Sequence, residues 1–401
     1  MGAGSFFIRK GVIDFLVAQQ KISGAHLAAY LVLARFTDEL GIFTTAGATA
    51  IQKNTGLSWK RANEVLADLM SLRGLIDPFK GNTKKNEGRI LWPIDEYCAL
   101  IKADPPSGRT TYALSNLASG SDENAWFSNE LVDGYGAFKT PLKTLIKYGD
   151  TAFRLLLMMY MYNDMEKFGG VNPYYVREEF SLEDIDSAPN GFDLHHAASL
   201  HHITNTPFAQ KCLRLLEVPK DEDERKKALA PFWQALKGLQ SSGLVYPVVT
   251  VFNDDPSKEK NSSASLLYVL HTKTQSGYVP KGEDGLASDT ARISSDFFKR
   301  PVCDSQGRFY GRYAVIVPAG MPVNVTGIFR LRFRVSNPAN AGVKDAWRMI
   351  ADANNEAKAW MNAIEGKKPE KEGVTSLLSM GNNPTQSPVS YALDQELETP
   401  F

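Results

Sequence analysis

The chain has 401 residues and equal numbers of basic and acidic side chains, 45 of each, so its formal net charge at pH 7 is zero. This length exceeds one ordinary domain and predicts two or three units, each large enough for its own core. The neutral balance argues against a protein whose only task is to hold DNA, so any such role must depend on local basic patches. Cys98, Cys212 and Cys303 show no paired spacing, which excludes a disulfide or zinc framework and indicates a reducing compartment.

Residues 1–23 predict an N-terminal helical extension with one short helix in the segment VIDFLVAQQ. The start of the chain lacks a secretory apolar region with a cleavage site. The densest apolar run, residues 153–162, is too short to span a bilayer. We therefore expect a cytoplasmic protein with no membrane partner.

Residues 24–97 have the pattern of one small domain. The segment GAHLAAYLVLARFTDELG predicts a helix that ends near Gly41, and IFTT predicts a short strand. A second short helical segment, AGATAIQKNTG, leads into SWKRANEVLADLMSLRG, where Ser58 is placed to cap the helix. In that helix the apolar residues recur at three- and four-residue steps, which predicts one inward face: Ala62, Val65, Leu66, Leu69 and Leu72.

The outward face of this helix begins with polar and aromatic side chains of the kind that bond phosphates and base edges from a helix N-terminus in a major groove. These residues are Ser58, Trp59, Lys60, Arg61 and Asn63. Two apolar strands, LIDPF and RILWPI, then flank a polar insert that predicts a β-hairpin wing. The wing carries one acid, Glu87, against four basic residues: Lys80, Lys84, Lys85 and Arg89.

The run TGLSWKRANEVLADLMSLRGLI resembles the recognition-helix region of bacterial winged helix-turn-helix proteins, and the similarity covers roughly residues 23–94. The resemblance implies a winged-helix fold and a double-stranded DNA partner. The same fold also serves repressors, replication initiators and pure protein-binding modules, so the resemblance leaves the biological role open.

Residues 98–139 are rich in Pro, Gly, Ser, Asp and Asn and predict a linker. Residues 140–272 predict a second, diverged winged-helix domain, because DEDERKKALAPFWQALKGLQ is amphipathic and leads into a Gly-Leu-Val strand entry. The segment NDDPSKEKNSSA then lies between two strand-like runs, as a wing would. Arg225, Lys226 and Lys227 open the expected recognition helix, but four acids directly precede them, so DNA contact and partner contact both remain open.

Residues 273–365 predict a C-terminal strand-and-helix segment. In the strand VTGIFRLRFRV, Arg330, Arg332 and Arg334 alternate with apolar residues, which predicts three guanidinium groups on one strand face. Such a face could follow a phosphate backbone or pair with carboxylates across the sheet. A helix is expected over residues 340–364, and the composition of residues 366–401 predicts a disordered tail.

Catalytic and metal motifs are not evident in the sequence. Four of the six histidines occur in DLHHAASLHH, at positions 195, 196, 201 and 202, without the spacing of a zinc helix or a completing cysteine or carboxylate motif. No phosphate-binding loop, dinucleotide glycine pattern, nucleophile elbow or paired-carboxylate signature occurs either. We expect no catalytic residue, no metal and no cofactor, and a protein that is not an enzyme.

The sequence therefore predicts an α+β, mainly α fold with tandem winged helix-turn-helix modules. The expected function is sequence-specific binding of double-stranded DNA as a homodimer, in a transcriptional regulator or in a replication initiator of the plasmid or phage type, which two modules in tandem resemble. The alternative is a winged-helix module that binds proteins and not DNA, which the zero net charge favours.

Overall fold

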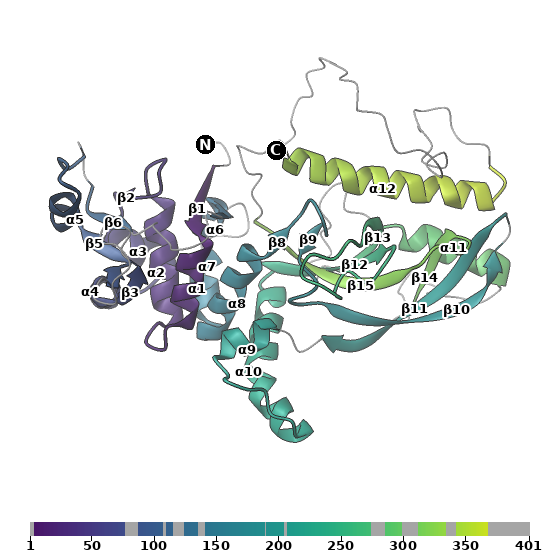
Figure 1. Ribbon diagram of the computed structural model, residues 1–401, viewed down its shortest axis with the longest axis horizontal. Coiled ribbons are helices and arrows are strands. Elements are labelled where there is room, and N and C mark those ends of the chain that lie inside the picture. Colours follow the sequence, from purple (N-terminus) through teal and green to yellow (C-terminus); the bar gives the residue numbers. More distant parts are fainter. Residues whose placement is uncertain are drawn as a thin grey trace, which may run out of the picture.

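The computed structural model describes residues 4–76, 87–106, 110–114, 124–134, 141–188, 190–203, 207–273, 285–298, 312–333 and 342–367. Figure 1 shows two regions, a group of short helices from the first part of the chain and a curved sheet with its covering helices from the rest. The helix α8 (Gly149–Met161) lies between them. The two regions meet at this helix, and also where Lys211 pairs with Asp14 and Arg214 donates to the carbonyl oxygens of Gln20 and Ile22.

The helical region begins with β1 (Ser5–Arg9), α1 (Lys10–Ala18), α2 (Gly24–Arg35), β2 (Phe43–Thr44), α3 (Ala48–Thr55), α4 (Trp59–Ser71), β3 (Arg73–Ile76), β4 (Glu87–Arg89), β5 (Leu91–Pro93), α5 (Ile94–Ile101) and β6 (Tyr112–Leu114). The helices α2, α3 and α4 each pack against the other two. Every residue of α2 from 26 to 34 is buried, as expected of a helix that is apolar on all sides. The strands β3 and β4 pair as a hairpin after α4.

Residues 98–139, predicted to be a linker, contribute paired strands. The strand β6 lies between β2 and β5 in a three-stranded sheet. The strand β7 (Asn124–Ser128) pairs with β1 and places Phe127 opposite Phe6, whose rings stack with centroids 5.3 Å apart. The short helices α6 (Glu130–Asp133) and α7 (Pro141–Ile146) follow. This stretch and the N-terminal segment are therefore parts of the helical region.

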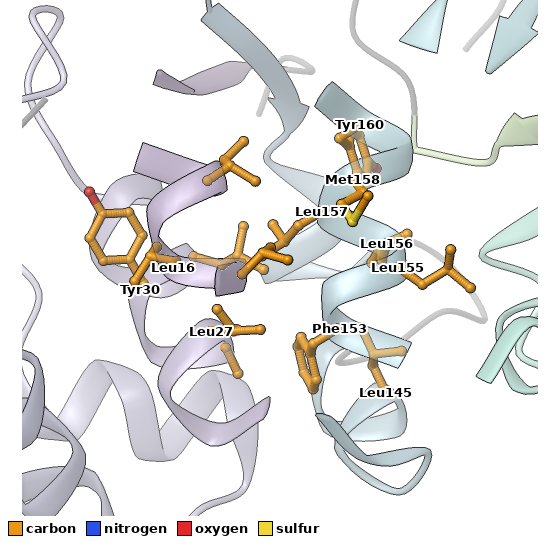
Figure 2. Close-up of a cluster of buried hydrophobic side chains, with 14 of the residues drawn as sticks. Leu16, Leu27, Tyr30, Leu145, Phe153, Leu155, Leu156, Leu157, Met158 and Tyr160 are labelled. Atoms are coloured by element: carbon orange, nitrogen blue, oxygen red, sulfur yellow. The ribbon is translucent and has the colours of Figure 1, made fainter. Parts of the chain in front are cut away.

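The helix α8 is the centre of a core that both regions share. All ten of its residues from Ala152 to Met161 are buried. Figure 2 shows Phe153 on the side of α8 that faces Leu27 of α2. At the other end of α8, the Tyr160 hydroxyl donates a hydrogen bond of 2.5 Å to the carbonyl oxygen of Phe333, just after the last strand of the sheet. The apolar contacts around α8 therefore join the helical region to the sheet.

The second region contains β8 (Asn163–Asp164), β9 (Gly170–Val171), β10 (Glu178–Ala188), β11 (Phe192–Ile203), α9 (Pro207–Leu213), α10 (Glu222–Ser241), β12 (Val245–Phe252), β13 (Leu266–Thr272), α11 (Ala287–Phe298), β14 (Arg312–Pro318), β15 (Asn324–Leu331) and α12 (Gly342–Ile364). Six of these strands form one antiparallel sheet in the order β13, β12, β15, β10, β11, β14. The sheet curls into a nearly closed barrel.

The two edge strands of this sheet, β13 and β14, do not pair through backbone hydrogen bonds in the strand order, but a side chain of β13 bonds the backbone of β14. The Tyr268 hydroxyl of β13 donates to the carbonyl oxygen of Ile316 at 3.2 Å and accepts from the amide of Ile316 at 3.0 Å. The amide of Val269 donates to Asn354 Oδ1 of α12 at 2.8 Å, and the amide of Leu286 donates to the Val269 carbonyl oxygen. Figure 1 shows α12 lying along this side of the sheet. The edges are thus covered, which protects them from pairing with other chains.

Replacing Tyr268 by phenylalanine should lower the free energy of unfolding by about 1–3 kcal/mol, because the buried amide and carbonyl of Ile316 would lose the partner that joins β13 to β14. Tyr30 is a matched control, because it is equally buried and its hydroxyl has no hydrogen-bond partner among the described residues. Urea unfolding should therefore show Tyr30→Phe at least as stable as the wild type. Equal stabilities for the two variants would contradict the role of Tyr268.

The predicted tandem of winged modules in a mainly α fold is wrong. The helix α10 and the strand after it form as expected, but β12 and β13 belong to the six-stranded sheet and are not an isolated wing hairpin. All residues of β12 are buried, and β12 pairs with β13 on one side and β15 on the other. The pattern of an amphipathic helix followed by a strand is local, and it does not specify which strands will pair. The hairpin of β10 and β11 also occupies the predicted second module.

The predicted stripe of three guanidinium groups is also wrong. Arg330 is fully buried, and its Nε donates to the carbonyl oxygen of Gly169 at 2.5 Å. The turn at Gly169 and Gly170 leaves room for it, because a Cβ on Gly169 would lie 3.1 Å from Arg330 Nη2. Arg332 is half-buried and donates from Nε to the carbonyl oxygen of Gly243 at 2.6 Å. The β8–β9 hairpin covers the face of β15 on which the alternating sequence placed the arginines. Arg334 lies outside the described residues.

Candidate nucleic-acid interface

The helices α3 and α4 form a helix-turn-helix over α2. The helix α3 ends at Gly56, whose φ of 74° is left-handed and therefore favours glycine, and the Gly56 amide donates to the carbonyl oxygen of Gln52 at 2.9 Å. The helix α4 starts three residues later, at Trp59, and the Ser58 hydroxyl accepts a hydrogen bond of 3.2 Å from the amide of Arg61. Ser58 is therefore the N-cap of α4, as predicted, and its hydroxyl oxygen accepts a hydrogen bond within the protein.

The buried side of α4 consists of Ala62, Val65, Leu66 and Leu69, as the periodicity predicts, whereas Leu72, also predicted on this face, is half-buried at the C-cap. The outward side starts with Trp59, Lys60 and Arg61, which are all exposed. The Trp59 side chain is 60% exposed, which is unusual for a residue of its size at the surface of a well-packed domain. The structure therefore places an exposed indole beside two cations in the first turn of α4.

The charges on α4 change sign along the helix. Arg61 forms an ion pair with Glu64 at 3.1 Å, and Asp68 lies further along the same helix. Asp68 bonds at 3.0 Å with Nε2 of the buried His26 in α2. Because acids repel phosphates, only the beginning of α4 is suited to approach a polyanion. The partial positive charge of a helix N-terminus adds to this preference.

Asn63 lies differently from the prediction. Its side-chain amide donates to the carbonyl oxygen of Trp59 at 2.9 Å, so the side chain folds back along its own helix. It can contact a base only after this bond breaks. Lys60 and Arg61 are therefore the side chains of α4 that are best placed for a first contact.

Two cations that the sequence did not single out lie near this turn. Lys53 is exposed in the last turn of α3. Lys143 is exposed on α7, and the carbons of its side chain lie against Gly56. No sequence signal could have identified Lys143, because it is distant along the chain and is brought to the turn only by the packing of α7 against α3.

Of the four basic residues predicted in the wing, the structure describes Arg89. Arg89 pairs with Glu96 at 2.6 Å and lies over the ring of Trp92. The wing lysines Lys80, Lys84 and Lys85 lie outside the described residues.

Arg225, Lys226 and Lys227 are exposed in the first turns of α10, which Figure 1 shows at the lower edge of the molecule, away from α4. Asp221 caps this helix by accepting from the amides of Asp223 and Glu224, and Lys226 pairs with Glu222 at 2.7 Å. The acids that precede these cations therefore have structural roles, and the start of α10 is a mixed-charge surface.

A second polar cluster lies on the curved sheet, where side chains of β10, β13 and β14 meet. Lys273, which directly follows β13, pairs with Glu178 of β10 at 2.8 Å, and its ammonium group lies 5.4 Å from the centroid of the Phe180 ring. The rings of His271 and Tyr313 lie 5.6 Å apart. Burial and the nearby carboxylate of Glu178 raise the pKa of Tyr313. The opposite charges of Lys273 and Glu178 therefore compensate one another.

His271 should make the protein less stable as the pH falls. Burial, and then the charge of Lys273, lower the pKa of His271 below its ordinary value of 6.5. The unfolded chain therefore takes up a proton that the folded chain resists, and stability is lost as the pH falls from 6.5 towards the folded-state pKa. Unfolding free energies measured between about pH 8 and pH 5 should fall less for His271→Gln than for the wild type. Parallel curves would contradict this role of His271.

Among the residues that the structure describes, no group of three or more His, Cys, Asp or Glu side chains could hold a metal ion. None of the described helices combines the length and the apolar composition that crossing a membrane requires. Comparisons with protein families, with curated proteins and with solved structures found no match for this chain. The function must therefore be inferred from the side chains themselves.

Proposed function

We propose that this protein binds double-stranded DNA with the first turn of α4. The observation that carries the proposal is the exposed group of Trp59, Lys60 and Arg61 at the start of a capped helix, directly after a helix-turn-helix turn. Lysine and arginine bond phosphates and guanine edges, and an indole makes apolar contacts with sugars and bases. The N-terminus of the second helix is the part of such a motif that reaches the bases in the major groove.

The distribution of charge supports an end-on approach of α4 to the groove. Lys60 and Arg61 come first, whereas Glu64 and Asp68 lie further along the helix. If α4 lay flat along the groove, these carboxylates would approach the phosphates of the duplex. The zero net charge of the chain agrees with a local contact of this kind, because no large basic surface is needed.

The ion pair between Arg61 and Glu64 suggests how the helix recognises a base. Both side chains are nearly half exposed, so the pair contributes little to stability. The carboxylate restrains the guanidinium near the start of α4, which reduces the entropy cost when Arg61 binds a guanine. In the bound state Arg61 exchanges a solvated carboxylate for the two acceptors of the base.

Binding of the full chain to a fluorescently labelled duplex of random sequence tests the proposal, with selection from a randomised pool as the test of specificity. We expect binding that weakens as salt concentration rises, because bound phosphates release counterions. We also expect the pool to converge on one sequence. If the duplex stays unbound even at low salt, the proposal is wrong and the protein-binding alternative is favoured.

Within this function we favour a transcriptional regulator that acts in the cytoplasm as a homodimer. A replication initiator of the expected type needs two winged modules in one chain, and a six-stranded sheet occupies the second position. A regulator needs only one DNA-binding unit in each protomer, because two protomers supply the two half-sites. A selected sequence with two-fold symmetry would support the regulator, and a single asymmetric site would count against it.

A further inference from the structure

The turn between α3 and α4 has a cation against it that belongs to neither helix. Lys143 lies on α7, and its Cε, Cδ and Cγ atoms are 2.9, 3.0 and 3.0 Å from the position that a Cβ on Gly56 would take. The whole aliphatic part of the side chain therefore lies flat on this glycine. The ammonium nitrogen, one bond beyond Cε, therefore lies close to the turn.

Lys143 has no carboxylate partner in the described part of the chain, so its ammonium group can bind an anion from outside the protein. In the described part of the chain, no carboxylate forms an ion pair with Lys143, Lys53 or Lys60. The acids closest to α7 along the chain have other partners: Asp133 pairs with Arg35 at 2.8 Å, and Asp150 accepts a hydrogen bond of 2.6 Å from the amide of Gly24. The turn is therefore flanked by lysines from three different helices.

We infer that Lys143 binds a phosphate of the DNA backbone, so that the interface extends from the helix-turn-helix onto α7. This inference rests on the proposed function. When the start of α4 enters the major groove, the preceding helix crosses the sugar-phosphate backbone, and the turn between them faces the same strand. A lysine held against this turn contributes one phosphate contact that does not depend on sequence.

A purely structural role is the competing explanation, because a lysine side chain can cover a glycine with its carbons and leave its charge in water. Two substitutions separate the explanations. Lys143→Met keeps a flexible apolar side chain over Gly56 and removes the charge, whereas Lys143→Arg keeps the charge. If the role is only structural, both variants should bind DNA as the wild type does.

The test is the salt dependence of binding of the full chain to the labelled random-sequence duplex. For Lys143→Met we expect the slope of log K against log salt to become shallower by about 0.9, the amount for one phosphate contact. The Arg variant should keep the wild-type slope, and so should Lys258→Met, which removes an exposed charge in the loop between β12 and β13. Thermal unfolding should be unchanged in Lys143→Met, which shows that the fold is intact.

A wild-type slope in Lys143→Met would overturn the inference. Suppose that the wild type binds DNA and that replacing Lys60 and Arg61 lowers its affinity, but that Lys143→Met leaves the salt dependence unchanged. The proposed function then stands, and the extension of the interface onto α7 is wrong. If the wild-type chain does not bind the duplex at any salt concentration, the proposed function fails first.

Discussion

Alanine at both Lys60 and Arg61 should weaken binding to a selected duplex by about tenfold or more for each base that these side chains recognise, because recognition of one base contributes roughly 1–3 kcal/mol. Both residues are exposed in the first turn of α4, so their removal leaves the core of that helix intact. Fluorescence anisotropy titrations of the full chain at a fixed salt concentration measure the effect. Thermal unfolding of the double variant should match that of the wild type.

The matched control is the replacement of Arg225 and Lys227 by alanine. This pair also combines one arginine and one lysine at an exposed helix start, and neither residue forms an ion pair with a described residue. It lies on α10, away from the helix-turn-helix (Figure 1). We expect the affinity of this double variant for the selected duplex to stay close to that of the wild type. An equal loss of affinity in the two double variants would show that binding depends on overall charge and not on α4.

Phe153→Ala should lower the free energy of unfolding by about 3–5 kcal/mol, the usual cost of removing a buried phenylalanine side chain. Phe153 is fully buried, and its Cδ2 lies 2.8 Å from the position that a Cβ on Gly24 would take, so it packs directly on the first turn of α2. Because α8 packs against α2 of the helical region and against α9 and α10 of the second region, the cavity should destabilise the two regions together. Urea unfolding followed by far-ultraviolet circular dichroism measures the change in stability.

Tryptophan fluorescence provides the second probe for this variant. Trp126 reports on the helical region, and Trp360 of α12 packs on the sheet, where its ring lies 6.4 Å from that of Tyr268. Variants that keep only Trp126 or only Trp360 of the six tryptophans should show coincident transitions, both shifted by Phe153→Ala. Leu216→Ala is the control, because Leu216 is 96% exposed. Two separate transitions, with only one shifted, would contradict a shared core.

The sequence predicted the helical region well where the signals are local. Ser58 caps α4 as expected, and the apolar spacing of Ala62, Val65, Leu66 and Leu69 defines its buried face. The short strand expected in IFTT is β2, and the helix expected over residues 340–364 is α12. Caps and helical periodicity depend on residues close in the chain, so they can be recognised without knowledge of the fold.

Apart from Asn63, which bonds back to Trp59 in its own helix, the errors concern contacts between distant segments. The strands β12 and β13 were predicted as a wing, because two consecutive strands most simply pair as a hairpin. In the structure, β15, β10, β11 and β14 complete their sheet. Arg330 was predicted to be exposed because alternation along a strand shows which residues share a face, but not whether another hairpin covers that face. Lys143 was missed for the same reason, because only tertiary packing brings it to Gly56.

The position of α8 limits how this protein can be divided for experiments. A recombinant fragment that stopped after α5 would keep α2, α3 and α4 but would expose the apolar side of α2 that rests on Phe153. Such a fragment would be prone to aggregation, and its failure to bind a duplex would say nothing about the intact protein. A fragment that ended at Met161 would in turn expose the side of α8 that packs against α9 and α10, so DNA binding should be tested on the full chain.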